Sequence, residues 1–311
     1  MAFRLLSYIR ENDRPGAGLF VEGKGVIDIE AVLESEKNVI DGTRPISILT
    51  VLKNWEKVLP VLRAVASNSS ASVSSRFFPL SDIRLTAPIL YPPNIYCAAA
   101  NYLDHRKEMG GPHLPDKQHA LPFFFTKLPR QTVIGPDESI RIPYPEAKVD
   151  WEAEIGVVIG RRCRKAAASE AMAYVAGYVI FNDISDRARL FRGDWHFKFD
   201  WFGGKSFDTS APMGPWITPA EFVPDPHQLT IQLWVNGERM QNASSSEMYF
   251  TISEQIEYLS ELITLLPGDV IATGTPAGVG HPKGLYLKPE DTVAITIEGL
   301  GSLKNPVVAG F

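Results

Sequence analysis

Polar and apolar residues alternate along the segment VDWEAEIGVVIG, residues 149–160. Every second residue, starting with the first, is apolar, and the positions between them open with three acids, Asp150, Glu152 and Glu154. A side-chain period of two is the signature of a β-strand, because successive side chains point to opposite faces of the sheet. The segment therefore predicts a strand that carries carboxylates on one face.

The acids on this strand have two interpretations. A half-solvated strand of an antiparallel sheet often carries acids on its wet face. Alternatively, Glu152 and Glu154 project to the same side, roughly 6.6 Å apart along the strand, and can converge on one hard cation such as Mg²⁺ or Mn²⁺. The pattern of this strand does not decide between the two.

Similar patterns predict a strand-rich chain with few helices. The expected strands are 94–100, 123–127, 152–160, 176–182, 228–235, 269–273 and 291–297. Asn236-Gly237 predicts a tight hairpin. Helices are expected at 167–177 and 253–265, the second with Ser253 as its N-cap. Many strands with few helices favour an α+β, strand-rich fold over a doubly wound parallel sheet.

The N-terminal region has a different pattern. Residues 1–66 mix short strands with a helical segment that we expect to break at Pro60. The small polar residues 67–75 are typical of a surface connection. We therefore predict a small N-terminal α+β domain, 1–79, and a larger domain, 80–311, which contains the acidic strand and would bind the metal and catalyse if the cation interpretation of that strand holds.

Composition narrows the possible partners. The chain has 311 residues, 45% of them hydrophobic, which is enough for a sizeable core. Its net charge of -5, without a long basic run, disfavours nucleic acids and anionic membranes. No apolar stretch is long enough to span a bilayer, and the first residues lack a secretory signal. Two cysteines, Cys97 and Cys163, are too few for a disulfide framework, so we expect a cytoplasmic protein.

A third carboxylate is a candidate partner of the two glutamates. The apolar run 178–181 stops at Asn182-Asp183. A carboxylate at the end of a buried strand must be paired, hydrogen-bonded or bound to metal. The alternative is an ordinary turn residue or helix cap, positions that Asp also favours.

The segment NYLDHRKEM contains a candidate general base. His105 and Glu108 are spaced i and i+3 and are neighbours if the segment is helical. A carboxylate beside an imidazole fixes its tautomer and raises its basicity. The alternative is an ordinary charge pair on a surface helix. Glycines, prolines and polar residues follow, so 101–122 is predicted to be a mobile lid.

Two further loops offer polar groups. Lys205 follows two glycines, and its amine can project from a tight turn. Residues 267–280 lead from a strand into a loop rich in Gly, Thr and Pro, where Thr273, Thr275 and backbone N–H groups can cradle a carboxylate.

Taken together and in this order, five segments resemble the fumarylacetoacetate hydrolase family, in particular its bacterial-type acylpyruvase and 2-hydroxyhepta-2,4-diene-1,7-dioate isomerase-like members. The resemblance covers roughly residues 85–308, and the segments are NYLDHRKEM, VDWEAEIGVVIG, GYVIFNDISDR, GGKSFDTSAPMGPW and LLPGDVIATGTPAGVG.

The resemblance implies a mixed β-roll, a homodimer and a role in aromatic catabolism. It implies Mg²⁺ or Mn²⁺, with Ca²⁺ as a further option, and a 2-oxo acid substrate. The roles that it implies are metal ligation by Glu152, Glu154 and Asp183, water activation by His105 and Glu108, catalysis and substrate binding by Arg187 and Lys205, and substrate carboxylate binding by Thr275.

The chain also departs from the family pattern after Asp183. Asp186 stands where the family often has a small residue, Ala188 replaces an acid, and Leu190 stands where a Gln often helps to position substrate. The aromatic-rich stretch 191–202 then follows. Its rings are either packing residues or a sign of a less polar pocket that suits an apolar substrate tail.

The expected activity is metal-dependent hydrolysis of a C–C bond in an acylpyruvate-type 2,4-dioxo acid. Decarboxylation, isomerisation or hydration of a 2-oxo acid through a metal-bound enolate is the alternative within the same family. A non-catalytic binding protein with an acidic surface strand is the alternative of another class, and it requires the three acids to be dispersed.

Overall fold

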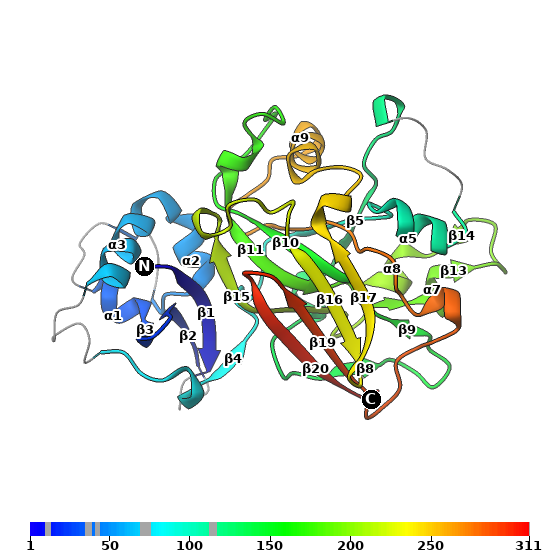
Figure 1. The fold of residues 1–311 in the computed structure, drawn as a ribbon, viewed down its shortest axis with the longest axis horizontal. Coiled ribbons are helices and arrows are strands. Elements are labelled where there is room, and N and C mark those ends of the chain that lie inside the picture. The colour runs from blue at the N-terminus through cyan, green and yellow to red at the C-terminus, as the bar shows by residue number, and fades with distance from the viewer. Residues whose placement is uncertain (10–13, 35–38, 41–43, 69–75, 112–116, 311) are drawn as a thin grey trace.

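The computed structural model describes residues 1–9, 14–34, 39–40, 44–68, 76–111 and 117–310 (Figure 1). In this part of the chain, strands dominate and helices are few and short, which confirms the α+β, strand-rich prediction. The predicted connection falls partly, at 69–75, outside the described residues, and so do residues 112–116 of the predicted lid.

One mixed sheet of 11 strands runs through the described residues. Its main path is β3-β2-β1-β15-β11-β10-β18-β5-β6, with β4 paired to β1 and β7 paired to β15. The strands are β1 (Phe3–Ile9), β2 (Pro15–Val21), β3 (Gly25–Asp28), β4 (Arg84–Thr86), β5 (Ile95–Ala98), β6 (Phe124–Lys127), β7 (Val133–Ile134), β10 (Ala153–Ile159), β11 (Val175–Asn182), β15 (Ala211–Pro219) and β18 (Val270–Ala272).

A second sheet of five strands has the order β17-β16-β19-β20-β8. Its strands are β8 (Ile140–Ile142), β16 (Thr230–Val235), β17 (Glu238–Ser244), β19 (Thr292–Ile297) and β20 (Gly301–Ala309). Two strand pairs complete the described set, β9 (Val149–Asp150) with β12 (Ser185–Asp186), and β13 (Phe191–Arg192) with β14 (Lys198–Phe199).

The helices lie around these sheets. The α-helices are α1 (Ile29–Leu33), α2 (Ile48–Lys53), α3 (Trp55–Ser67), α5 (Leu103–Glu108), α6 (Pro129–Thr132), α7 (Arg187–Leu190), α8 (Trp201–Lys205) and α9 (Ile252–Leu262). The short 3-10 helices are Leu80–Asp82, Lys117–His119, Ala171–Tyr174, Ala220–Phe222, Ser245–Glu247 and His281–Lys283. Helices α5, α7 and α8 and the pair β13–β14 gather at one end of the molecule, on the right in Figure 1.

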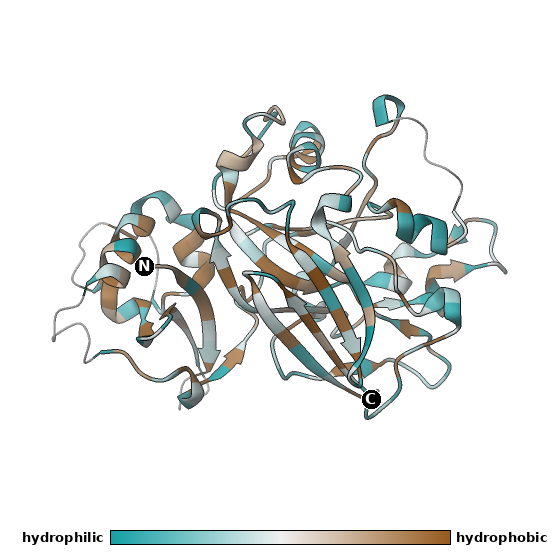
Figure 2. Ribbon diagram, in the orientation of Figure 1, coloured by the Kyte–Doolittle hydropathy of each residue, from teal (hydrophilic) through white to brown (hydrophobic). Residues whose placement is uncertain are grey.

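The N-terminal strands extend the large sheet. Strand β1 pairs antiparallel with β15 through Leu5 and Ile217. Apolar residues of the N-terminal region, such as Phe3, share one buried cluster with Val158 and Phe181 of the central strands. Both regions carry apolar residues along their strands (Figure 2), and burial of these residues in one cluster joins the two regions.

The predicted strands are confirmed, each with ends within two residues of the expected ones. Asn236-Gly237 forms the turn between β16 and β17, with positive φ at both residues, as a tight hairpin of this type requires. These strands have strong local signals, which explains why their positions could be predicted.

Three helix predictions were wrong in position. The segment 167–177 forms only the short 3-10 helix and then enters β11, because pairing with β10 and β15 overrides its helical propensity. Pro60 lies inside α3, and the chain breaks at Asn54, between α2 and α3. The N-cap of α9 is Thr251, whose side chain forms a capping box with Glu254.

Strand β15 was not predicted, although it is central in the large sheet. Its sequence contains prolines, which cannot donate a ladder hydrogen bond. The register between β11 and β15 shifts between the pairs Tyr178–Thr218 and Ile180–Gly214. This irregularity places Pro215 in a bulge, where the missing N–H is tolerated.

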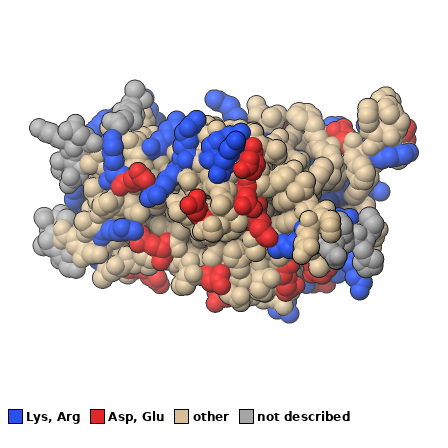
Figure 3. All heavy atoms as spheres, turned by 90° about the horizontal axis from the view of Figure 1, so that it is seen from above, with Lys and Arg blue, Asp and Glu red and all other residues tan. Residues whose placement is uncertain are grey.

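Charges on the surface are mixed. On the face in Figure 3, Lys and Arg side chains lie beside Asp and Glu side chains, so the face carries no field of a single sign. Among the described residues, no helix combines the length and the apolar character needed to cross a membrane.

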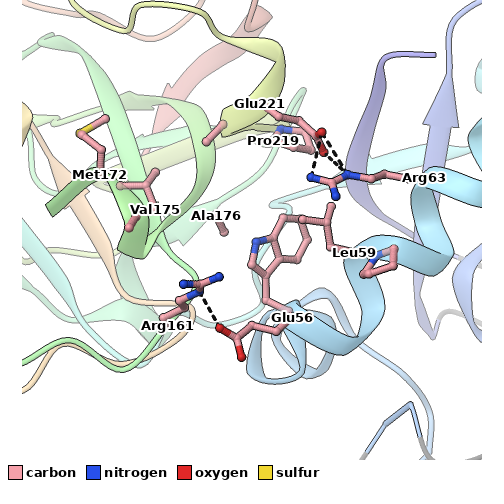
Figure 4. A pocket seen from close by; sticks show the side chains of 13 residues that line it. Glu56, Leu59, Arg63, Arg161, Met172, Val175, Ala176, Pro219 and Glu221 are labelled. Carbon is pink, nitrogen blue, oxygen red and sulfur yellow. Dashed lines mark hydrogen bonds and ion pairs between the residues drawn. The ribbon is translucent and has the colours of Figure 1, made fainter. Parts of the chain in front are cut away.

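A cavity of about 410 Å³ lies between α3 and the ends of β11 and β15 (Figure 4). Arg63 pairs with Glu221 across it at 3.0 Å, and Arg161 pairs with Glu56 at 2.7 Å. The charged residues thus neutralise one another and join the N-terminal helix to the sheet. The predicted metal ligands do not line this cavity.

Candidate active site

Three carboxylates meet beside the large sheet. Antiparallel pairing of β10 with β11 sets Ala153 opposite Asn182, which brings Glu152 and Glu154 next to Asp183. One oxygen from each acid lies within 4.8 Å of the others. The side chains are buried, with exposed fractions of 5% for Glu152 and 1% each for Glu154 and Asp183. The half-solvated interpretation of this strand is therefore wrong, and so is the dispersed arrangement that a non-catalytic protein required.

Two predicted cations lie against these acids. The Lys205 Nζ atom is 2.7 Å from Glu152 Oε2 and 2.7 Å from Asp183 Oδ2. The Arg187 Nη2 atom donates to Glu152 Oε1 at 2.5 Å, and its Nε atom donates to Asp150 Oδ2 at 2.9 Å. Lys205 and Arg187 thus hold the acids together by charge-assisted hydrogen bonds.

Sequence reasoning missed a third cation, Lys127. It ends β6 with its side chain fully buried, and its Nζ atom lies 2.8 Å from Asp183 Oδ1. It also donates to the backbone carbonyls of Ile184 at 2.8 Å, Lys205 at 2.5 Å and Ser210 at 2.9 Å. The available signal was a lysine at the end of an apolar run, because a buried ammonium requires partners of this kind.

Burial and neighbouring charges act in opposite directions on these acids. Burial raises the pKa of a carboxyl, but the charges of Lys205 and Arg187 outweigh it and hold the pKa of Glu152 well below its usual range. Burial raises the pKa of Glu154 well above its usual range, and the neighbouring charges of Asp183 and Glu152 raise it further. Burial lowers the pKa of Lys205, whereas Asp183 and Glu152 raise it, with a net increase.

The residues fit a divalent cation. Four acids and three bases form the cluster, so it lacks one positive charge when all are ionised; the acids are Asp150, Glu152, Glu154 and Asp183, and the bases are Lys127, Arg187 and Lys205. Buried carboxylate oxygens are ligands that Mg²⁺ and Mn²⁺ prefer. A divalent cation beside Glu154 would more than offset this negative charge.

A backbone N–H group helps to position Glu154. Gly274 donates to its Oε2 atom at 2.8 Å. Gly274 has a φ of +95°, and a side chain there would start 2.7 Å from the Cβ of Asn101. A glycine is therefore needed at this point of the loop.

Asp150 is buried but has another function than the two glutamates. It accepts hydrogen bonds from Arg187 and from the backbone N–H groups of Gly280 at 2.7 Å and His281 at 3.1 Å. Asp150 thus orients Arg187 and ties the loop after β18 to the site.

The departures from the family pattern have local explanations. Asp186 caps α7 through the N–H of Ala188 at 3.0 Å and accepts from the Tyr144 hydroxyl at 2.5 Å. Leu190 is buried and faces the cavity beside the acids. The larger acid at 186 therefore stabilises the turn, while position 190 makes the cavity less polar.

The predicted base forms as expected on α5. His105 Nδ1 lies 2.9 Å from Glu108 Oε1, and Glu108 Oε2 accepts from the N–H of Gly278 at 2.9 Å. If Nδ1 carries the proton toward Glu108, Nε2 is left as the proton acceptor. His105 is buried and lines the same cavity as Glu152 and Glu154.

The start of the predicted lid forms hydrogen bonds to other segments. Asn101 donates to the carbonyls of Phe250 at 2.9 Å and Thr273 at 2.8 Å, and Tyr102 is fully buried. The hydrogen bonds of Glu108 to the loop after β18 hold the end of α5. His105 is therefore fixed near the acids by its own segment.

Thr275 lies in the site with its hydroxyl already engaged. The hydroxyl donates to the carbonyl of Ala153 at 2.9 Å and accepts from Gln241 Nε2 at 2.8 Å. Gln241 also accepts from the Ala153 N–H at 3.0 Å and donates to the Pro276 carbonyl at 2.8 Å. Gln241, a buried amide that sequence reasoning missed, therefore fixes the Thr275 loop against β10. A substrate carboxylate at the Thr275 hydroxyl would have to displace one of its hydrogen bonds.

These groups line one cavity of about 140 Å³. Its polar side is formed by His105, Glu152, Glu154, Arg187, Lys205 and Thr275, and its apolar side by Ala98, Ala99, Ala100, Met109, Phe125, Leu190, Phe191 and Trp201. All the predicted catalytic and substrate-binding residues except Glu108, which contacts His105 directly, are among them.

The chain is similar to known proteins in sequence and in fold. The fumarylacetoacetate (FAA) hydrolase C-terminal family model matches residues 94–308. Oxaloacetate tautomerase FAHD2B, mitochondrial, from Bos taurus is 36% identical over 291 residues, covering 92% of this chain and 85% of the relative. The structure of maleylpyruvate hydrolase from Sphingobium sp. SYK-6 in complex with manganese(II) ion and pyruvate aligns with a TM-score of 0.76 at 28% identity, covering 99% of this chain and 100% of that chain. The structure of 5-carboxymethyl-2-hydroxymuconate delta-isomerase from Mycobacterium smegmatis aligns with a TM-score of 0.70 at 30% identity, covering 99% of each.

The chain belongs to the fumarylacetoacetate hydrolase family, whose members include hydrolases, isomerases and tautomerases. It is an enzyme of that family, and its fold is the strand-rich fold that the family shares.

Proposed function

We propose that the protein is a divalent-metal-dependent hydrolase that cleaves the C–C bond of an acylpyruvate-type 2,4-dioxo acid. The observation that carries the proposal is the His105–Glu108 pair in the same cavity as Glu152 and Glu154. Hydrolysis needs a base for water next to an anion-stabilising centre, and the cavity offers both.

The carboxylates Glu152, Glu154 and Asp183 would hold the ion, and Mg²⁺ and Mn²⁺ are the candidates. When bound, the ion supplies Lewis acidity toward the oxygens of a 2-oxo acid. The manganese and pyruvate in the related maleylpyruvate hydrolase support this assignment.

The protein's own residues account for the proton transfers. His105 Nε2 takes a proton from water while Glu108 holds the other ring nitrogen. The water oxygen bonds to the distal carbonyl carbon, and cleavage of the C–C bond releases a carboxylic acid and the enolate of pyruvate. Arg187 and Lys205 form ion pairs with Glu152 in the cavity, and their positive charges stabilise the negative charge that develops on the substrate oxygens. The enolate carbon then takes up the proton that His105 received from water.

Keto–enol tautomerisation of a 2-oxo acid is the second candidate. It is supported by the oxaloacetate tautomerase from Bos taurus, which aligns with 92% of the chain. The same base would move a proton between the substrate's carbon and oxygen, without a water molecule and without C–C cleavage. The two candidates therefore differ in their products.

The test is product analysis with a matched control. The protein with Mg²⁺ is given acetylpyruvate or enol-oxaloacetate, and pyruvate, acetate and the enol absorbance are followed. Pyruvate and acetate in equal amounts support hydrolysis, whereas loss of the enol without cleavage supports tautomerisation. His105→Ala should lower the rate of the observed reaction by about 10²–10⁴-fold, and His119→Ala, at an exposed histidine on the same segment, should leave it unchanged.

Two further expectations remain proposals. We propose a homodimer, as the family resemblance implies, which light scattering can measure. We also propose a cytoplasmic location, supported by the buried free thiols Cys97 and Cys163.

A further inference from the structure

We infer that the substrate of this site carries an uncharged, ring-bearing acyl tail, as in an aroylpyruvate, and that Phe191 and Trp201 select it. The inference rests on the proposed function, because it places the 2-oxo acid end of the substrate at the carboxylates. It concerns the other end, which must lie along the apolar side of the cavity.

The rings on the apolar side of the cavity, together with the neighbouring Phe199, form an aromatic wall, defined here as Phe125, Phe191, Phe199 and Trp201. Trp201 stacks on Phe125 with ring centroids 5.1 Å apart and an interplanar angle of 26°. Phe199 stacks on Trp201 at 6.2 Å and meets Phe191 edge-on at 5.8 Å. These ring contacts thus connect Phe125, which lines the cavity, to the strand pair β13–β14.

The outer part of the wall is open to solvent. Phe191 is 36% exposed and Phe199 is 50% exposed. Large apolar side chains that are left exposed beside a cavity commonly mark a binding surface. A flat aromatic ring is the ligand that such faces prefer, through offset stacking.

The small size of the cavity also indicates that the substrate tail extends beyond it. About 140 Å³ is small beside the ~300–1,000 Å³ of typical ligand pockets. The cavity can hold the pyruvate end of a substrate. A longer tail has to extend beyond it, and Phe191 is the most exposed of the residues that line it.

The charges around the cavity disfavour a substrate tail that ends in a carboxylate. Among the described residues that line the cavity, the lysine and arginine side chains are Lys205 and Arg187, and both are bound to buried acids. The nearby Arg192 on β13 pairs with Asp194 through two contacts of 3.0 Å. Lys198 on β14 donates to the carbonyl of Gly193 at 3.1 Å. A carboxylate at the end of the tail, as in fumarylpyruvate, would therefore lie against aromatic rings, beside cations that already have partners, at a desolvation cost.

The turnover experiment compares three tails on the intact protein with Mn²⁺, namely benzoylpyruvate, acetylpyruvate and fumarylpyruvate. We expect kcat/KM for benzoylpyruvate to exceed that for acetylpyruvate by about tenfold or more, because benzoylpyruvate buries one aromatic ring that acetylpyruvate lacks. Phe191→Ala and Trp201→Phe should reduce this ratio. Phe197→Ala, a 70% exposed aromatic residue that does not line the cavity, is the matched control and should preserve it. Phe191→Arg should shift the preference toward fumarylpyruvate.

A binding experiment separates this inference from the proposed function. Calorimetry with phenylpyruvate and pyruvate needs no turnover, and phenylpyruvate should bind about tenfold tighter, with the advantage reduced in Phe191→Ala. If no acylpyruvate is cleaved but this difference is found, hydrolysis is wrong and the aromatic subsite stands. Equal affinities for the two acids, a preference for fumarylpyruvate in the unmodified protein, or an equal loss in Phe197→Ala would each overturn the inference.

Discussion

Replacement of Lys127 by Met tests whether the buried ammonium holds the site together. Methionine keeps a similar length and apolar stem but removes the charge and its donors. Lys127 is fully buried, pairs with Asp183 and donates to three backbone carbonyls, those of Ile184, Lys205 and Ser210. Its loss leaves Asp183 with less positive charge nearby and three carbonyls without this donor.

The magnitude follows from these contacts. Breaking a buried ion pair from one side costs about 3–5 kcal/mol. Each buried carbonyl left without a partner would add about 1–3 kcal/mol, but the chain relaxes and these terms do not add. We therefore expect the free energy of unfolding to fall by about 3–5 kcal/mol, a large part of the ~5–15 kcal/mol of a typical protein.

The assay is urea unfolding of wild type and variant, followed by circular dichroism. Lys283→Met, at an exposed lysine, is the control and should change the free energy of unfolding by no more than about 0.5 kcal/mol. An unfolding free energy of Lys127→Met within about 1 kcal/mol of wild type would refute the reasoning, because the hydrogen bonds would then contribute little.

Three other predictions concern the site. Mn²⁺ at 100 times its Kd should stabilise the wild type by about 2.7 kcal/mol, and Asp183→Asn should lose this stabilisation in a thermal unfolding assay. The control Glu261→Gln, at an exposed acid, should behave as wild type. An equal stabilisation of Asp183→Asn would remove Asp183 from the ligand set. Because the pKa of Glu154 is raised, a proton competes with the cation, so Mn²⁺ affinity should increase with pH until Glu154 is ionised; titrations between pH 5.5 and 8 that give one constant Kd would contradict this. His105→Ala should lower kcat by about 10²–10⁴-fold and leave Mn²⁺ affinity unchanged, with a smaller loss in Glu108→Gln, and a kinetic assay with parallel Mn²⁺ titration measures both.

Prediction from the sequence succeeded where the signal is local. The alternation around Glu152 predicted the strand that is β10, and the apolar run before Asp183 predicted the strand that is β11. Both strands lie within two residues of the predicted positions. The i, i+3 spacing of His105 and Glu108 gave their contact, because a helix brings such residues together. The family resemblance supplied Arg187 and Lys205, which local patterns did not identify as partners of the acids.

The sequence left open everything that depends on contacts between distant segments. It could not show that both faces of β10 are buried, because burial of the acidic face requires Arg187 and Lys205, which come from helices α7 and α8 and lie 35 and 53 residues from Glu152. Lys127 and Gln241 carried no motif, since their importance comes from partners that the fold brings to them.

The sequence by itself determined the strands with a clear apolar pattern, the hairpin turn and the supply of acids, bases and aromatic rings, because these depend on side-chain period and residue type. The tertiary structure decided which charges neutralise one another, which hydroxyl is already engaged and where the aromatic wall meets the cavity. The physical reason is that electrostatic energy and burial depend on distances between residues far apart in the chain, and only strand pairing fixes those distances.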